Sequence, residues 1–391
     1  MNEVVLLLMT GGPRGSAVER VVTEACEAAT RDTIERALDA RSITRIVVAT
    51  DSEALAARLG HLPVTVDLDA PGERFHFGGR LVNLIERYHM ERVLYMGGGS
   101  GVLLTTADLD RLGRALASAD RLLVVNNFFS TDFAGWTPAN CLADLILPKF
   151  DNELGWLLGD VAGLPVIALE RNATTQFDID TPTDLLTVAL HPAVGPHLRG
   201  HLDTLSLNTD RLDRALRCFN DSHAEVIIFG RAGAAAWAYL ESETACRIRM
   251  VSEERGMRAD GRLFRAEARS LLGYYMEHVG LREGFNLLAE LGDAAFVDSR
   301  VLWAHFAHWA SPSERFLSDL GQVDEIQDPW LREFTSAVLA APIPIVLGGH
   351  SLVAGGLYVL AEAALAGNGN QGRRRPNLSL SRSDPLGLTV G

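Results

Sequence analysis

The sequence predicts an α/β protein with two tandem domains, each a mainly parallel sheet flanked by helices. A length of 391 residues exceeds what one hydrophobic core usually organises. Short apolar runs alternate with longer helical patterns, and this alternation weakens over 191–210 before it starts again. Runs such as VVLLLM at 4–9 show no polar alternation, which is typical of strands that are covered on both faces.

The first series of strands and helices predicts a domain over residues 1–195. Its strands are expected at 4–9, 45–50, 63–68, 92–97, 121–126 and 165–170. Its helical patterns lie at 18–40, 53–59, 79–89 and 106–119. Thr105 and Asp108 are placed to cap the last of these helices.

The second series predicts another α/β domain over residues 223–366, after a connection at 196–222. Its strands are expected at 225–230, 246–252, 294–299 and 343–349, and its helices at 232–240 and 263–291. Residues 367–391 are polar and rich in turn-forming residues, so we expect a disordered tail there.

Composition and charge exclude several classes of protein. Hydrophobic residues make up 47% of the chain, as in folded globular proteins. A net charge of −14, from 36 basic and 50 acidic residues, disfavours nucleic acid or an anionic membrane as the main partner. Because Lys149 is the only lysine, recognition of anions falls to arginine. The four cysteines have no zinc-site spacing, which indicates reduced thiols.

Two segments bear on localisation. The chain begins with an acidic residue and a short apolar run, which is unlike a signal peptide. Residues 334–361 carry no formal charge, but prolines and glycines interrupt them, so a strand, a glycine turn and a buried helix are expected rather than a membrane span. The sequence therefore predicts a cytoplasmic protein.

Polar loops follow the expected strands of the first domain. In a parallel sheet such loops meet at the carboxyl edge, where ligands bind. The loop after the first strand is rich in glycine, which allows backbone N–H groups to approach phosphate, and Arg14 could pair with a phosphate oxygen. A plain tight turn explains this loop equally well. The predicted nucleotide-binding residues are Thr10, Gly11, Gly12, Arg14, Asp51, Gly98, Gly99 and Ser100.

The segment FDIDTPTDLL at 177–186 places two carboxylates on one face of an extended stretch. Asp178 and Asp180 are two residues apart, and a Thr-Pro helix start follows them. Paired hard oxygens beside a glycine-lined cleft suit Mg²⁺ bound to phosphates. The alternative is that Asp180 or Thr181 only caps the helix. We expect Asp178 and Asp180 to be catalytic metal ligands.

The order of these motifs resembles nucleotidyltransferases of the glycosyltransferase-A-like fold over residues 1–190. The relevant segments are LLLMTGGPRG, RIVVATDSEAL, YMGGGSGVLLTTADLDRL and FDIDTPTDLL. The resemblance is greatest to molybdenum-cofactor guanylyltransferase (MobA-like) and phospholactate guanylyltransferase relatives. It implies that Gly11 and Gly12 hold a nucleoside triphosphate and that Asp178 or Asp180 binds magnesium.

Two departures from the family pattern matter for activity. The family's central metal-binding aspartate aligns with Ser100, and no lysine follows the first loop. A hydroxyl is a poorer magnesium ligand than a carboxylate, and phosphoryl transfer depends on charge neutralisation.

The second domain, expected to be Rossmann-like, carries charged residues at its strand ends. These residues predict an anion site if the strands form one parallel sheet. A network of surface salt bridges is the alternative. The candidates are Gly230, Arg231, Glu253, Glu254, Arg255, Arg258, Asp298, Arg300, Gly349, His350 and Ser351.

These observations lead to one leading hypothesis and two rivals. The leading hypothesis is an enzyme that transfers a nucleoside monophosphate from a nucleoside triphosphate to a phosphorylated small molecule, with Mg²⁺. The first rival is an inactive protein that binds a nucleotide or sugar nucleotide. The second is an enzyme whose active site lies in the second domain. Fold alone does not separate these hypotheses.

Overall fold

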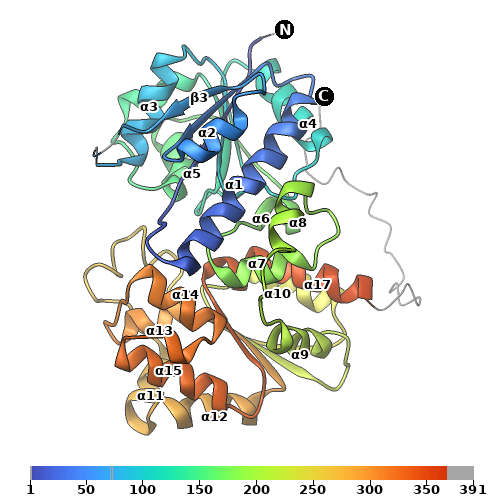
Figure 1. Ribbon diagram of the computed structural model, residues 1–391, viewed down its shortest axis with the longest axis vertical. Coiled ribbons are helices and arrows are strands. Elements are labelled where there is room, and N and C mark those ends of the chain that lie inside the picture. Colours follow the sequence, from blue (N-terminus) through green and yellow to red (C-terminus); the bar gives the residue numbers. More distant parts are fainter. Residues whose placement is uncertain (1, 71, 73, 368–391) are drawn as a thin grey trace.

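The computed structural model describes residues 2–70, 72 and 74–367. Two α/β units are stacked along the long axis, the first in the upper half of Figure 1 and the second in the lower half. Each contains one sheet flanked by helices, which confirms the predicted fold class. The predicted tail lies, from residue 368 on, outside the described residues, and the predicted domain boundaries remain predictions.

The first sheet has seven strands in the order β3-β2-β1-β4-β6-β5-β7. All neighbours pair in parallel except β6, which is antiparallel to β4 and β5. Its strands are β1 (Val5–Thr10), β2 (Arg45–Thr50), β3 (Thr65–Leu68), β4 (Val93–Gly97), β5 (Leu122–Val125), β6 (Phe133–Thr137) and β7 (Val166–Ala168). The six strands expected from the apolar runs are therefore all present, within a few residues.

Strand β6 is the one strand that the sequence analysis does not predict. It is only five residues long and contains Gly135, which weakens the strand signal. The glycine is required by packing, because a Cβ there would lie 2.7 Å from Leu116 of α4 (Thr106–Ser118). The strand fills the space between β4 and β5.

The remaining helices up to residue 218 connect these strands and lead into the second unit. They are α1 (Ala17–Leu38), α2 (Glu53–Leu59), α3 (Phe77–Arg87), η1 (Ala139–Asp144), η2 (Asp151–Glu153), α5 (Leu154–Trp156), η3 (Leu157–Val161), α6 (Ala173–Gln176), α7 (Pro182–Ala189), α8 (Pro196–Leu202) and α9 (Asp210–Cys218). The expected cap of α4 is confirmed, because Thr105 and Asp108 form a capping box.

The second sheet has four parallel strands in the order β11-β10-β8-β9. The strands are β8 (Glu225–Gly230), β9 (Arg247–Ser252), β10 (Ala294–Asp298) and β11 (Ile345–Gly348). The helices are α10 (Ala234–Glu243), α11 (Leu271–Val279), α12 (Leu281–Leu291), α13 (Ser299–His305), α14 (Pro312–Leu320), η4 (Val323–Glu325), α15 (Pro329–Ala340), α16 (His350–Val353) and α17 (Gly355–Gly367).

The long helix expected over 263–291 is divided. Gly280 has φ of 87°, in the region that favours glycine, and it separates α11 from α12. Residues 253–270 form an irregular loop instead of a helix. Glu253 accepts a hydrogen bond from Leu271 N at 2.8 Å, and Glu254 accepts one from Arg269 N at 3.0 Å. These side chains therefore fix both ends of the loop.

The uncharged segment 334–361 forms part of α15, then β11, α16 and α17, as its glycines and prolines predict. None of the helices in the described part of the chain is long and apolar enough to cross a membrane.

Helix α1 joins the two units. Its later residues Ile34 and Ala37 pack into the core under the first sheet. Its earlier residues Val18 and Val22 belong to the apolar cluster that surrounds the second sheet. Figure 1 shows the helix, in blue, running from the upper unit down to α14. One helix therefore contributes to the apolar clusters of both units and holds the units together.

Asp32 fixes α8 against α1. Its two carboxylate oxygens accept hydrogen bonds from the backbone N–H groups of His197 and Leu198, each at 2.9 Å. The close approach depends on Gly195, because a Cβ there would lie 2.2 Å from Asp32 Cγ. Asp32 is only 3% exposed, so its loss would leave two helix N–H groups without an acceptor.

We therefore expect Asp32→Ala to lower the free energy of unfolding by about 1–3 kcal/mol. Glu24→Ala, at an exposed position of the same helix, is the matched control and should change it by no more than about 0.5 kcal/mol. Urea unfolding followed by circular dichroism measures both. Equal midpoints for the two variants would contradict this role of Asp32.

Candidate functional site

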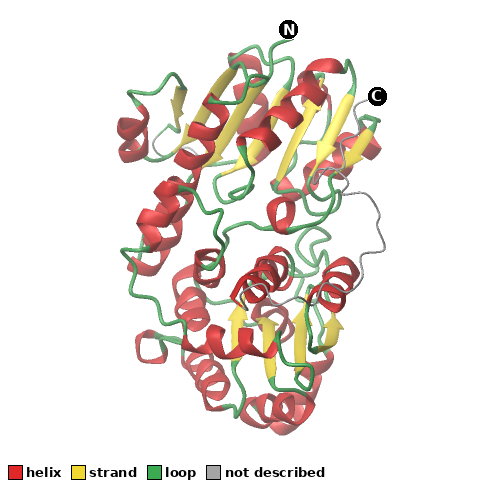
Figure 2. Ribbon diagram, turned by 90° about the vertical axis from the view of Figure 1, so that its right-hand side faces the viewer, coloured by secondary structure: helices red, strands yellow, loops and turns green. Residues whose placement is uncertain are grey.

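The carboxyl end of the second sheet lies against the segment that carries Asp178 and Asp180. Ser351, just after β11, donates its hydroxyl hydrogen to the backbone oxygen of Asp178 at 2.7 Å. Thr183 of α7 donates to the backbone oxygen of Leu347 in β11, also at 2.7 Å. The arrowheads of the lower sheet in Figure 2 point toward the upper sheet. Loops of both sheets therefore meet at one place.

The glycine turn after β4 lies between the end of β1 and the Asp178 segment. A Cβ at Gly98 would lie 2.2 Å from Thr10 Oγ1, and one at Gly99 would lie 2.5 Å from the backbone oxygen of Ile179. Ser100 forms an isolated antiparallel bridge with Asp178. The structure therefore brings together Thr10, Gly98, Gly99, Ser100 and Asp178, which are distant in sequence.

The first loop is held by acidic side chains. Arg14 donates to both carboxylate oxygens of Asp51 at 3.0 Å and to Glu27 at 2.8 Å. Gly11 lies over Asp51, because a Cβ there would be 2.8 Å from Oδ1, and Gly12 lies over Thr23 in the same way. Two carboxylates thus compensate the single cation of this loop.

Four aspartates gather at the edge of the first sheet near the second unit: Asp132, Asp151, Asp178 and Asp180. Asp132 accepts a hydrogen bond from Asn126 Nδ2 at 2.8 Å, and Asp151 accepts one from the Tyr95 hydroxyl at 3.2 Å. Asp180 is exposed, whereas the other three are half-buried.

Burial and neighbouring negative charge raise the pKa of Asp132, Asp151 and Asp178. Burial, and then the charge of Asp180, raises the pKa of Asp151 to about 6. Burial and the charges of Asp180 and Asp132 hold the pKa of Asp178 well above its ordinary value. Burial and the charge of Asp151 do the same to the pKa of Asp132. Clusters of perturbed carboxylates are typical of functional sites, because a bound cation relieves their repulsion.

The oxygen donors at this edge suit a magnesium ion that also binds substrate phosphate. Magnesium is commonly held by one or two carboxylates together with water and substrate phosphates. Asp178 and Asp180 supply such oxygens. In the described ranges, three potential ligand atoms lie within 4.8 Å of one another only at Asp32, Glu35 and His197. Both oxygens of Asp32 already cap α8. The acidic edge therefore fits a metal shared with phosphate rather than a metal enclosed by protein.

The end of β8 carries an ion pair within the second unit. Arg231 donates to both oxygens of Asp298, through Nε at 2.5 Å and through a terminal nitrogen at 3.1 Å. Asp298 is fully buried, and burial raises its pKa, but the charge of Arg231 and its hydrogen bond to the carboxylate outweigh this effect and leave the pKa lowered. Gly230 has φ of 118°, and a Cβ there would meet Asp298 at 2.4 Å.

Beside this pair lies a small hollow of about 30 Å³ lined by both units. His350 lines this hollow. Burial and the charge of Arg231 lower the pKa of His350 to about 4, which keeps the ring neutral near pH 7. No side chain in the described part of the chain forms an ion pair with Arg171 or Arg255. The lining residues are Asn127, Arg171, Gln176, Arg231, Gly233, Ala235, Ala236, Arg255, His350, Ala354 and Tyr358.

The first turn of α10 also lines the hollow. Its cap residue, Gly233, has no side chain to occupy the free N–H groups. Together with three arginines, these groups make a setting that suits an anionic end group such as phosphate.

Several other residues that the sequence predicted for the anion site of the second unit do not line this hollow. Arg300 pairs with buried Asp319 and does not line the hollow. Arg258 reaches the first unit, where its guanidinium lies 4.0 Å from the ring centroid of Phe150. Glu253 and Glu254 hold the 253–270 loop, as described above. Gly349 precedes α16, which has only four residues.

Several residues of these two clusters are absent from the sequence prediction. Asp132 directly precedes the unpredicted strand β6, and Asp151 begins η2 further along the chain, so their approach to Asp178 has no sequence signal. Arg171 lies shortly after the end of β7, a position that favours ligand binding in a parallel sheet, whereas Gln176 lies at the end of α6 and has no such signal.

Comparison with known proteins finds no family model and no curated protein that matches this chain. Similar solved structures include a cytidylyltransferase from Leptospira borgpetersenii, with 15% identity, a TM-score of 0.37, and coverage of 48% of this chain and 85% of that one. A CMP:2-keto-3-deoxy-manno-octonic acid synthetase complexed with CTP has 13% identity and a TM-score of 0.35, covering 48% and 97%.

A third structure is the 4-diphosphocytidyl-2C-methyl-D-erythritol synthase of Anaerococcus prevotii. It has 12% identity and a TM-score of 0.33, covering 46% of this chain and 92% of that one. These three proteins are cytidylyl-type enzymes by name, and the expected kinship with guanylyltransferases remains a prediction. At this similarity they identify no substrate for this chain.

The pKa of Asp151 makes stability depend on pH. The folded state keeps a proton up to about pH 6, whereas the unfolded chain loses it near pH 4. The folded state therefore binds more protons over this range, and the free energy of unfolding falls as pH rises. Asp151→Asn removes the group that must lose its proton. We therefore expect it to raise the free energy of unfolding by about 2 kcal/mol at pH 8 and to change it very little at pH 3.5.

Urea unfolding in EDTA at both values measures the effect, with exposed Asp160→Asn as the control that should show no such difference. A gain for Asp151→Asn that is equal at both pH values would refute the proposed protonation.

Proposed function

We propose that the chain transfers a nucleoside monophosphate from a nucleoside triphosphate to a phosphorylated small molecule, at a magnesium-dependent site between the carboxyl ends of its two sheets. One observation carries this proposal: a cluster of four aspartates and a hollow lined by three arginines both lie where the two units meet, near the hydrogen bond from Ser351 to the Asp178 backbone. A metal–triphosphate and an acceptor phosphate require opposite charges in this way.

In this reaction an oxygen of the acceptor phosphate attacks the α-phosphorus of the triphosphate. The bond from the α-phosphorus to the bridging oxygen breaks, and pyrophosphate leaves with the electron pair. Magnesium held by Asp178 and Asp180 would neutralise charge on the phosphates. Arg255 and Arg171 would hold the acceptor phosphate, since Arg231 is already paired with Asp298 and the hollow admits an end group and not a whole nucleotide.

A non-catalytic nucleotide-binding protein is the second candidate. It is favoured by the compensation of Arg14, because Asp51 and Glu27 leave the first loop without a free cation for the triphosphate. Thermal-shift measurements with a panel of nucleoside triphosphates, with and without Mg²⁺, detect binding under either candidate. Pyrophosphate release in the presence of phosphorylated acceptors occurs only under the first.

We expect Asp180→Asn to lower the rate of magnesium-dependent pyrophosphate release at least about a hundredfold, because a metal ligand is lost. Unfolding should be nearly unchanged, since Asp180 is exposed. Asp160→Asn is the matched control and should keep full activity. A fully active Asp180→Asn enzyme would move the chemistry away from this edge.

The arginine hollow is tested with inorganic phosphate as the probe. We expect Arg255→Met to weaken phosphate binding at least about tenfold in calorimetry, because a charge-assisted hydrogen bond contributes about 1.5–3 kcal/mol. Arg249→Met, on the neighbouring strand β9 and paired with Glu225, should bind phosphate normally. Equal affinities for the two variants would place the anion outside the hollow.

A further inference from the structure

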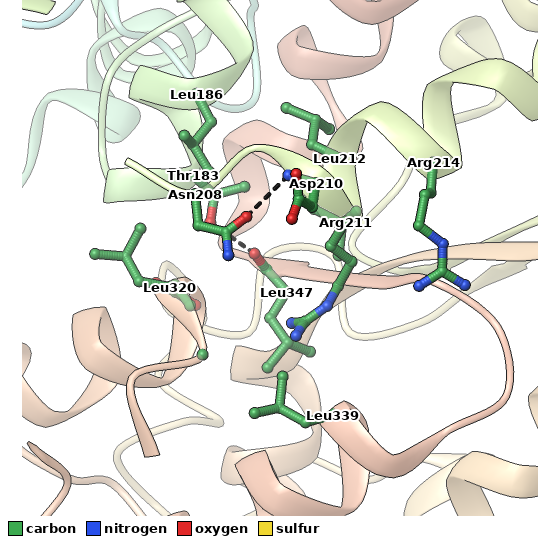
Figure 3. Close-up of a pocket in the computed structure, with 13 residues that line it drawn as sticks. Thr183, Leu186, Asn208, Asp210, Arg211, Leu212, Arg214, Leu320, Leu339 and Leu347 are labelled. Carbon is green, nitrogen blue, oxygen red and sulfur yellow. Dashed lines mark hydrogen bonds between the residues drawn. The ribbon is translucent and has the colours of Figure 1, made fainter. Parts of the chain in front are cut away.

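A second cavity lies behind the contact between α7 and β11, apart from the acidic edge and the arginine hollow. Its volume is about 310 Å³, within the size range of small-molecule sites. Residues of α7, α9, α15 and β11 and the end of α14 line it. The hydrogen bond from Thr183 to Leu347 closes one wall (Figure 3).

Apolar side chains form about half of the wall, and charged or polar side chains form the rest. Burying apolar ligand surface here is favourable by about 25 cal/mol per Å². The apolar side chains are Leu186, Leu212, Leu320, Leu339, Val346 and Leu347. The cavity therefore suits a ligand with a hydrocarbon body.

Two arginines of the wall, Arg211 and exposed Arg214, have no ion-pair partner in the described structure. Arg211 is half-buried and extends from α9 toward Leu347 in Figure 3. Its guanidinium has no hydrogen bond or ion pair with any described residue. Burial and the neighbouring charge of Arg214 lower its pKa. An unpaired guanidinium removed from water is costly, and an anion would offset this cost.

The acidic residues nearby do not neutralise Arg211. Both oxygens of Asp319 accept hydrogen bonds from Arg300. Asp210, at the start of α9, is exposed and makes no ion pair with Arg211 in the described structure. Because Arg300 neutralises Asp319, the wall has two cations, Arg211 and Arg214, against the single charge of Asp210, so a singly charged group balances it better than a phosphate monoester does. A carboxylate also matches the planar fork of a guanidinium.

We propose that this cavity binds a small monocarboxylate with an apolar body, whose carboxylate pairs with Arg211 and whose hydrocarbon part packs on the leucines. The site does not depend on the function proposed above, because it shares no residue with the acidic edge or the arginine hollow.

Calorimetric titration with octanoate tests the proposal. We expect the full chain to bind octanoate, and to bind octanol and octylamine at least tenfold more weakly, because neither supplies an anion. Arg211→Met keeps the length of the side chain but removes its charge, and it should weaken octanoate binding at least tenfold. Arg217→Met, on an exposed part of the same helix, is the matched control and should bind normally.

Leu339→Trp tests the cavity without changing Arg211, because the larger side chain should fill the cavity and block octanoate binding. Asp178→Asn separates this site from the proposed function: it should leave octanoate binding unchanged even if it abolishes every activity of the acidic edge. Circular dichroism confirms that each variant is folded. The proposal is overturned if octanoate does not bind at millimolar concentration, or if Arg211→Met binds it as tightly as Arg217→Met does.

Discussion

The two sheets act as one structure because the segment around Asp178 is bound to the carboxyl end of the second sheet. Ser351 donates to the backbone of Asp178, and Thr183 donates to the backbone of Leu347. Gly355 allows α17 to approach, since a Cβ there would lie 2.0 Å from the backbone oxygen of Gln176. Asp178 is half-buried at this contact, and burial together with the charges of Asp180 and Asp132 holds its pKa well above the ordinary value.

The arginines of this chain differ in whether a carboxylate pairs with them. Arg14, Arg231 and Arg300 each pair with a buried carboxylate, those of Glu27, Asp298 and Asp319. Such pairs position loops and strand ends but offer little to a ligand. Of the three arginines that line the hollow, Arg171 and Arg255 lack ion-pair partners in the described structure, so these two are the more available to an anion there.

The sequence predicts the strands well and the partners of its charged residues poorly. All ten expected strands form, most of them from unbroken apolar runs that favour burial on both faces, whereas the small residues Ala134 and Gly135 keep β6 from giving that signal. Arg14 illustrates the limit for the site. Its place after β1 follows from the sequence, but its pairing with Asp51 and Glu27 depends on how β2 and α1 pack around it.

The most direct measurement is a crystal structure with Mn²⁺ and a nucleoside triphosphate analogue that cannot be cleaved at the α-phosphorus. Anomalous scattering locates the metal without reference to activity. We expect a manganese peak in contact with the carboxylate of Asp178 or Asp180. We also expect the α-phosphate of the analogue to face Arg255. A nucleotide bound elsewhere, or manganese held only by Asp32, Glu35 and His197, would contradict these expectations.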